Sequence, residues 1–430
     1  MVDALLITEY ALGMRYEELL ARGADFKRYL QAILPLLGRR ERGHHAQVYI
    51  RDLLVEGGRK TPAAIAKRWP DGNVQALQQL TGQSPWDSWK VRRAVCELVL
   101  QELTDLQQPV WIVDDTAFPK KGDHSVGVAR QYCNTLGKVA NCQVAVSLHL
   151  ATTRVSFPVD FALYLPRSWT EDPAAPRVRK AGLPPNVTFK AKWQLALELI
   201  DRARSWNLPA GPVVADAAYG RVVEFRRELA ARQLHYVVGI DKDTLLAPLA
   251  VPSTDDGFEV YPGDCKTVSQ LAREQPAAAW RKVTWRTGTK GALESRFWAA
   301  RLQAPEGEVW LLAEWPPGAD EPENFWLSNL PAETSLSRLV YYAKSRWWVE
   351  QNYRQLKNEL GLDHYEGRTW QGWHHHVTLV MVAFGFLVLE FLRAQKKPIF
   401  LVDDTEPEAS PSSVPHLMVR VLPHLQAEDC

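Results

Sequence analysis

Three acidic residues stand where their surroundings would direct carboxylates toward a common point. Asp114 follows the apolar run of residues 109–113, and Asp216 follows a second apolar run of residues 211–215. Both runs have the pattern of buried strands, and Glu350 lies in a later segment with helical spacing. Hard divalent cations prefer oxygen ligands, and paired cations stabilise both oxygens of a phosphoryl displacement. The sequence therefore predicts a divalent-metal site suited to phosphodiester chemistry.

The segment around Glu350 adds two cations to the same helical face. Residues four and seven positions apart lie on one side of an α-helix, so Arg346 and Lys357 share the face of Glu350. Arginine binds phosphate through two parallel hydrogen bonds, and lysine acts as a point charge. Taken alone, this pattern also describes a solvated helix face with salt bridges. Together with the two aspartates, it favours an acid flanked by phosphate-binding cations.

Neighbouring acids offer alternatives to these assignments. Asp114 and Asp115 are adjacent, so their side chains point to opposite faces of a strand and only one can be the first ligand. We favour Asp114, with Asp115 as the alternative. Asp216 could instead be a turn or helix-capping residue, and Glu366 is the main alternative to Glu350.

The composition is that of a globular protein. The 430 residues include 46% apolar and 23% charged residues, which predicts several domains or one elaborated domain. The net charge is +1, so DNA binding would depend on local basic groups. The five cysteines form no Cys-x-x-Cys pair, which argues against zinc and disulfides and favours a reducing cytoplasm. The longest apolar run, residues 377–389, is shorter than the roughly 20 residues of a membrane span and predicts a buried core helix.

The N-terminal quarter, residues 1–105, has helical patterns. Thr61 before a proline is a good helix start. Short helices are expected near residues 62–69 and 73–81. They could form a DNA-binding helix-turn-helix, or they could belong to a bundle that packs on the catalytic domain or a second subunit.

The next part of the chain alternates strand and helix patterns. Strands are expected near residues 109–115, 142–151, 154–164, 212–216 and 235–241, and helices near 189–206 and 221–233. This β-β-β-α-β-α-β order is that of a ribonuclease H-like mixed sheet. The carboxylates at the ends of the first and fourth strands, Asp114 and Asp216, favour this sheet over a generic α/β fold. The predicted fold class is therefore α/β, with an RNase H-like mixed sheet.

The final third interrupts and then completes this domain. Residues 242–333 hold turn signals and short β-like runs, which predict a β-rich insertion before the glutamate helix. One long helix over about 334–360 and a buried helix near 375–394 would follow. The predicted domains are a helical N-terminal domain for DNA binding or dimerisation (1–105), the catalytic domain (106–241 and 334–395), the insertion (242–333) and a mostly disordered tail (396–430).

Three short blocks carry a family resemblance. These blocks resemble the catalytic blocks of bacterial insertion-sequence transposases of the DDE superfamily. They are Asp-Asp-Thr from Asp114, Ala-Asp-Ala-Ala-Tyr-Gly around Asp216, and Arg-x3-Glu-x6-Lys around Glu350. The most similar group has a Tyr-Arg-Glu-Lys signature and a β-rich insertion. Residues 118–133 and 361–368 are similar to its DDE endonuclease branch, and the resemblance spans roughly residues 40–395.

The tyrosine of that signature is missing at its expected place. It would fall seven residues before Glu350, where this chain has Ala343. Tyr341 and Tyr342 are its neighbours, but one position changes the direction of a helical side chain by about 100°. The resemblance therefore carries over Arg346, Glu350 and Lys357, and leaves the tyrosine's phosphate-binding role without a residue.

The resemblance implies an enzyme that cuts DNA at transposon ends and joins the freed 3′-OH to target DNA. Asp114, Asp216 and Glu350 would bind two Mg²⁺ ions, for which Mn²⁺ would substitute. The partner would be double-stranded DNA, bound by a homodimer in the cytoplasm of a bacterium, associated with the nucleoid and not with a membrane. Two alternatives are a metal-dependent nuclease or resolvase without strand transfer, and a domesticated DNA-binding protein without catalysis.

Local basic and aromatic residues would make the DNA contacts. The predicted DNA-binding residues are Arg346, Lys357, Lys120, Lys121 and Arg130. In the insertion, Trp280, Trp285 and Trp298 could stack on an unpaired base, although packing within a sheet is the commoner role. Consecutive helical residues point about 100° apart, so the run His374–His376 cannot bind one ion, and a helix start near DNA phosphate or solvent is expected.

Overall fold

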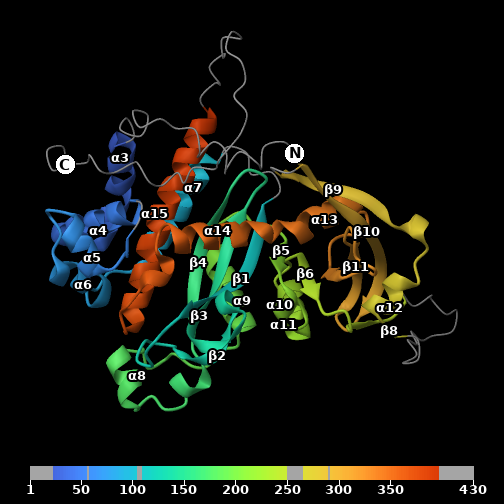
Figure 1. Cartoon of the computed structure of the whole chain (residues 1–430), viewed down its shortest axis with the longest axis horizontal. Helices are drawn as coiled ribbons and strands as arrows, with labels where there is room; N and C mark the ends of the chain where they lie inside the picture. Colours follow the sequence, from blue (N-terminus) through green and yellow to red (C-terminus); the bar gives the residue numbers. More distant parts are fainter. Residues whose placement is uncertain (1–22, 56–57, 104–108, 249–264, 289–290, 397–430) are drawn as a thin grey trace, which may run out of the picture.

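The computed structural model describes residues 23–55, 58–103, 109–248, 265–288 and 291–396. The predicted disordered tail therefore lies, apart from its first residue, outside the described residues. A long mixed sheet runs through the molecule, with helices on both of its faces and a helical N-terminal part at one end (Figure 1).

The central strands have the ribonuclease H-like order. They are β1 (Val110–Pro119), β3 (Lys138–Ala151), β4 (Ser156–Tyr164), β5 (Val213–Ala215) and β6 (Tyr236–Ile240). β3 is antiparallel to both β1 and β4, whereas β5 is parallel to both β1 and β6. The spatial order β4-β3-β1-β5-β6 confirms the predicted α/β fold with an RNase H-like mixed sheet. One strand was not predicted: β2 (Ala129–Cys133) pairs with the start of β3.

The β-rich segment that follows extends this sheet. Its longer strands are β9 (Arg281–Gly288), β10 (Gly291–Ala304), β11 (Gly307–Trp315) and β12 (Asn324–Ser328). They form an antiparallel series in which β12 pairs with β6, so one sheet of ten strands results. Two short strands, β7 (Leu245–Leu246) and β8 (Lys266–Thr267), form a separate pair beside α12 (Val268–Arg273). The pairing of β12 with β6 satisfies the backbone groups that β6 would otherwise expose at a sheet edge.

Alternation along β1 assigns its residues to two cores. Val110 and Ile112 face a core shared with α13 (Leu336–Ser345) and α14 (Trp347–Asn358). Trp111 and Val113 face the larger core on the opposite side, formed with α9 (Lys192–Ser205), α10 (Ala217–Gly220) and α11 (Val223–Ala231). Because neighbouring strand residues point to opposite faces, Asp114 lies on the α13–α14 side.

The N-terminal helices surround one long C-terminal helix. They are α3 (Gly23–Ile33), α4 (Arg40–Leu53), α5 (Pro62–Arg68), α6 (Val74–Gly82) and α7 (Ser88–Glu102). The helices α3, α4, α6 and α7 pack with α15 (Trp370–Lys396), and α5 packs on α4 and α6. α15 is longer than the predicted 375–394 helix, and an 18-residue stretch of it, with a mean hydropathy of 2.0, would suit a membrane span by length and composition alone. However, 78% of its apolar window is buried inside the fold, so packing against α4, α6 and α7 accounts for its apolar character.

The three consecutive histidines of α15 are buried, so their predicted place near DNA phosphate or solvent is wrong. His375 stacks on Trp86 with 3.7 Å between ring centroids, and His376 shares a 2.9 Å hydrogen bond with the Tyr49 hydroxyl. Burial lowers the pKa of His375 and of His376 to about 4. The N-terminal helices cover this part of α15, as they would in the predicted bundle that packs on the catalytic domain, and this covering buries the histidines.

Candidate active site

Asp114 occupies a buried position in the middle of β1. The residue is 7% exposed, and its Oδ1 accepts a 2.8 Å hydrogen bond from the Asp115 amide. Burial raises the pKa of Asp114 to about 7, because removal from water disfavours the charged form; Asp216 adds to the rise and Arg346 opposes it. A carboxylic acid that titrates near neutrality inside a fold is a frequent mark of a functional site.

Asp115 points to the other face of the sheet, as expected for neighbouring strand residues. Its Oδ2 lies 2.6 Å from the Lys192 ammonium of α9. The Asn134 amide donates a 2.9 Å hydrogen bond to the Asp115 carbonyl. Asp115 is therefore held in a salt bridge on the α9 side, and the geometry favours Asp114 over Asp115 as the catalytic aspartate.

Asp216 lies directly after β5 and caps the short helix α10. Its Oδ1 accepts a 2.9 Å hydrogen bond from the Ala218 amide, so the capping role considered from the sequence is real. The turn is pressed against β6: a Cβ at Gly220 would lie 1.9 Å from the Gly239 carbonyl oxygen, which leaves room only for glycine. The charge of Asp216 raises the pKa of Asp114 and of Arg346, so Asp216 interacts electrostatically with both.

Arg346 joins the strand acid to the helix acid. Its Nη1 lies 2.6 Å from Asp114 Oδ2, and its Nη2 lies 2.6 Å from Glu350 Oε1. Burial disfavours the guanidinium charge, but the surrounding carboxylates outweigh burial and raise the pKa of Arg346. The predicted single helix over 334–360 is in fact two helices, α13 and α14, and Arg346 is the residue between them.

The donor chemistry of this cluster fits a hard divalent cation, because it consists of carboxylate oxygens. The carboxylates are not, however, gathered into a ready ligand set. Within the described ranges, no group of three or more His, Cys, Asp or Glu residues is placed to hold a metal ion. Instead, the Arg346 guanidinium lies between Asp114 and Glu350 and neutralises them.

Glu366 lies in different surroundings from Glu350. Its side chain is 60% exposed and pairs with Arg59 Nε at 3.2 Å. Glu350 is also exposed, but it shares Arg346 with Asp114. This contrast favours Glu350 as the acidic partner of Asp114.

The predicted DNA-binding cations fall into two groups. Lys357 donates 2.9 Å hydrogen bonds to the Ala117 carbonyl and to Thr135 Oγ1, and burial lowers its pKa. Lys120 donates to a main-chain carbonyl of the segment before α15, and burial lowers its pKa to about 8. Lys121 and Arg130, by contrast, are exposed. The structure therefore presents Lys121 and Arg130 to solvent and holds the other two against the fold.

Two tyrosines near the carboxylates, Tyr219 buried and Tyr353 half-buried, were not predicted from the sequence. Tyr353 lies three residues after Glu350 on α14, and its hydroxyl is 2.6 Å from Ser147 Oγ. The Tyr219 hydroxyl is buried without a hydrogen-bond partner in the described part of the chain. Burial raises the pKa of each tyrosine, and the charge of Asp114 raises it further. Helical spacing from Glu350 could have indicated Tyr353.

The residue that replaces the family's tyrosine lies away from solvent. Ala343 is 5% exposed and packs in the core between α13 and the sheet. Its neighbour Tyr342 accepts a 3.2 Å hydrogen bond from Arg338 Nε on the same helix. Position 343 therefore offers no side chain that could replace the phosphate-binding tyrosine of the signature.

The tryptophans of the β-rich segment pack against one another and against the sheet. The ring centroids of Trp280 lie 5.4 Å from Trp315 and 6.4 Å from Trp298, and Trp285 lies 5.8 Å from Phe297. These contacts support the sheet-packing alternative over base stacking.

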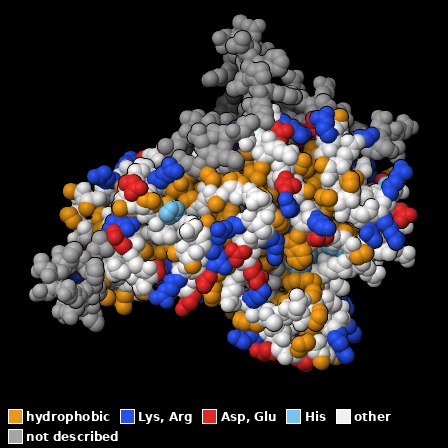
Figure 2. All heavy atoms as spheres, turned by 180° about the vertical axis from the view of Figure 1, so that it is seen from behind, with side chains coloured by type: hydrophobic (Ala, Val, Ile, Leu, Met, Phe, Trp, Pro, Cys, Tyr) orange, Lys and Arg blue, Asp and Glu red, His pale blue; other side chains and the backbone are white. Residues whose placement is uncertain are grey.

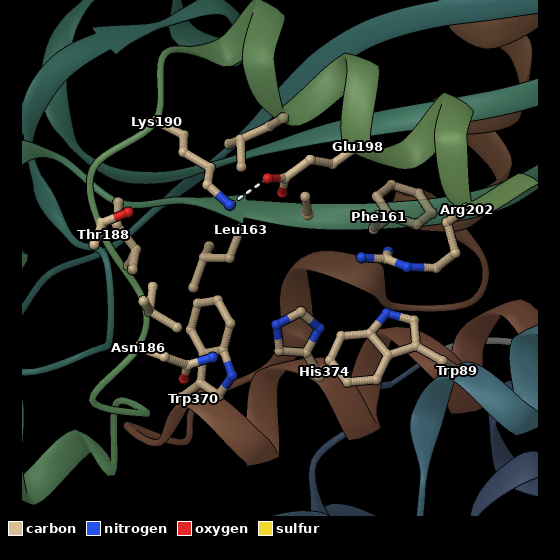
Figure 3. A pocket seen from close by; sticks show the side chains of 14 residues that line it. Trp89, Phe161, Leu163, Asn186, Thr188, Lys190, Glu198, Arg202, Trp370 and His374 are labelled. Atoms are coloured by element: carbon tan, nitrogen blue, oxygen red, sulfur yellow. Dashed lines mark hydrogen bonds and ion pairs between the residues drawn. The ribbon is translucent and has the colours of Figure 1, made fainter.

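Charge and cavities elsewhere do not indicate a second catalytic cluster on the described surface. Lys and Arg side chains on the rear face are interspersed with Asp and Glu (Figure 2). A cavity of about 200 Å³ lies between β4, α9 and α15, with Lys190, Glu198, Trp370 and His374 in its lining (Figure 3). None of the three carboxylates lines it.

Comparison with known proteins decides the family. The sequence model described as "DDE superfamily endonuclease" matches residues 32–292, more than half of the chain. The chain belongs to this family. It is also 29% identical over 307 residues to a probable transposase for insertion sequence element IS701 from Microchaete diplosiphon, covering 70% of this chain and 71% of the relative. The predicted resemblance to insertion-sequence transposases of the DDE superfamily is therefore confirmed. The family match includes Asp114 and Asp216 and ends before Glu350.

Proposed function

We propose that this DDE endonuclease is an insertion-sequence transposase that cuts DNA at the ends of its element and transfers the freed 3′-OH strands into target DNA. The observation that carries the proposal is the bridge from Asp114 through Arg346 to Glu350. The charge of Asp216 also acts on Asp114, which supports Asp216 as the third acid of the proposed site.

The catalytic residues of the proposal are Asp114, Asp216 and Glu350, which would bind two Mg²⁺ ions, with Mn²⁺ as a possible substitute. These ions would supply Lewis-acid activation of water and of the 3′-OH. The side chains of this protein position that chemistry. Asp114 must give up its proton near pH 7 before it can bind a cation, and burial keeps competing water away.

Arg346 has two roles in this proposal. While the carboxylates have no other counter-charge, its guanidinium neutralises Asp114 and Glu350. When a bound cation supplies the counter-charge of the carboxylates instead, the guanidinium of Arg346 can bind a DNA phosphate in two parallel hydrogen bonds. One residue thereby stabilises the unliganded site and recognises the substrate.

The remaining DNA contacts are proposed for Lys120, Lys121, Arg130 and Lys357. Lys121 and Arg130 are exposed and can reach phosphates directly. Lys357 and Lys120 are tied to main-chain carbonyls and would add positive charge near the site. Because two ends must be cut together, we propose a homodimer on double-stranded DNA, in the bacterial cytoplasm and associated with the nucleoid.

Two other functions fit part of this geometry. A nuclease or resolvase would use the same carboxylates without strand transfer. A domesticated DNA-binding protein would need none of them, so the shared ion pairs of Asp114 and Glu350 favour catalysis.

A cleavage assay tests the proposal directly. Labelled DNA carrying the ends of the element is incubated with Mg²⁺ or Mn²⁺ and with wild type, Glu350→Gln or Glu366→Gln. We expect metal-dependent cutting by wild type and by Glu366→Gln, and loss of cutting of at least about a hundredfold in Glu350→Gln. Joined products would distinguish a transposase from a nuclease. DNA binding without cutting by wild type would contradict catalysis and favour the domesticated alternative.

A further inference from the structure

The hairpin formed by β2 and β3 (residues 129–142, the β2–β3 hairpin) exposes an unusual amount of apolar surface. Seven large hydrophobic side chains are exposed in the described part of the chain, and three of them lie in this hairpin. They are Tyr132 at 62%, Val139 at 54% and Leu136 at 46% exposure. Such a cluster on one small element marks a contact surface more often than chance exposure does.

Two of the three side chains share one face of the hairpin, and the third lies at its tip. Tyr132 and Val139 are direct cross-strand partners, so their side chains are neighbours on the same face. Arg130 lies two residues before Tyr132 and therefore shares that face. Leu136 ends the short turn Asn134–Leu136 at the tip. The surface thus combines an aromatic ring, two aliphatic side chains and a guanidinium.

The tip of this hairpin is fixed to the catalytic strand. Asn134 Oδ1 accepts a 3.0 Å hydrogen bond from the Ala117 amide, and its Nδ2 donates to the Asp115 carbonyl at 2.9 Å. Thr135 Oγ1 donates a 2.9 Å hydrogen bond to the Ala117 carbonyl and accepts one from Lys357. The apolar surface therefore belongs to a rigid element bonded within three residues of Asp114.

The charges around this surface favour nucleic acid as its occupant. Arg130 and Lys138 are exposed on the hairpin, and Lys121 is exposed in the loop before it. The nearest acid in that loop, Asp123, pairs with His124 at 2.6 Å. Aromatic side chains stack on any base, and apolar side chains such as leucine can wedge between base steps. Exposed basic side chains on and before this hairpin, whose tip is bonded to β1, match DNA next to a cut phosphate.

We propose that the β2–β3 hairpin contacts the bases beside the cut phosphate, with Tyr132 stacking on a base and Leu136 inserted at the adjacent step. This inference rests on the proposed function and adds the residues that distort the DNA at the cut. Arg130 would hold the neighbouring phosphate, so one hairpin would combine backbone and base contacts.

The test uses full-length protein with Glu350→Gln, so that bound DNA is not cut. The probe is a duplex of the element's end with 2-aminopurine placed on either side of the cut, because unstacking of this base changes its fluorescence. Tyr132→Ala and Leu136→Ala are compared with Tyr132→Phe, which keeps the ring. Leu293→Ala is the matched control, since Leu293 is also exposed on a hairpin but lies in β10.

We expect Tyr132→Ala and Leu136→Ala each to weaken binding about tenfold and to reduce the 2-aminopurine signal. Tyr132→Phe should restore both, and Leu293→Ala should behave like the parent protein. Equal affinity and equal fluorescence in all variants would overturn the inference while leaving cleavage by wild type, and thus the proposed function, intact. Conversion of a dimer to a monomer with unchanged DNA affinity would also overturn it, because the surface would then be a protein interface. Absence of binding and cutting by wild type would overturn both proposals.

Discussion

Replacing Asp114 by asparagine should make the metal-free protein more stable at alkaline pH, although it removes a proposed catalytic residue. Burial raises the pKa of Asp114 from 3.8 to about 7. Between these two values the folded state keeps a proton that the unfolded state has lost, so stability falls as pH rises. Each unit of pKa difference is worth 1.36 kcal/mol, so the full effect above pH 7 is about 4 kcal/mol.

Asparagine resembles the protonated acid in shape and charge, so Asp114→Asn should recover up to about 4 kcal/mol at pH 8 and little at pH 4. With an unfolding entropy of about 2.1 cal/mol/K per residue, a chain of 430 residues would gain roughly 4–5 °C in Tm. The measurement is thermal unfolding of both proteins at pH 5 and pH 8 in buffer with a chelator.

Two comparisons make this measurement decisive. Asp115→Asn removes the less exposed partner of the salt bridge with Lys192, so it should lower Tm or leave it unchanged at both pH values. Mg²⁺ should raise the Tm of wild type more than that of Asp114→Asn, because a bound cation stabilises the ionised carboxylate. An equal loss of stability in Asp114→Asn at pH 5 and pH 8 would refute the reasoning, since the cost of ionising a buried carboxylate would then be absent.

Two further predictions concern how the acids are held. Gly220→Ala would place a Cβ 1.9 Å from the Gly239 carbonyl oxygen, so it should destabilise the protein by about 1–3 kcal/mol and impair cleavage by moving the turn after β5. The control is Gly82→Ala, which should be neutral or stabilising because nothing lies within 4 Å of the added Cβ. Urea unfolding measures the stability of both variants. Arg346→Gln removes a cation that favours the Asp114 carboxylate, so the pH midpoint of Mn²⁺ binding should rise by about 1 unit or more, and an unchanged midpoint would show that Arg346 does not stabilise the charge of Asp114.

The sequence alone was informative about strands and helices whose pattern is local. The apolar runs before Asp114 and Asp216 are true strands, since a fully buried strand must be apolar on both faces. The opposite directions of Asp114 and Asp115 followed from the two-residue period of a strand. The spacing of four between Arg346 and Glu350 placed these side chains together, as their ion pair shows.

Other elements could not be predicted because distant parts of the chain determine them. The histidines of α15 look solvent-facing in sequence, yet the N-terminal helices bury them. The β2–β3 hairpin was missed because its outward face is apolar and its anchors, Asn134 and Thr135, have partners only in the folded protein. A turn at Arg346 divides a segment whose periodicity suggested one helix.

The sequence by itself determined most of the strands and helices of the central sheet, their order, and the types of groups that could do chemistry. Periodicity and strand ends are short-range properties, so they can be read from neighbouring residues. The tertiary structure decided the state of those groups. It buries Asp114 enough to raise its pKa to about 7, places Arg346 between two carboxylates and carries the insertion strands onto the edge of β6. Burial and charge coupling depend on side chains brought together from more than two hundred residues apart, and no local pattern contains that information.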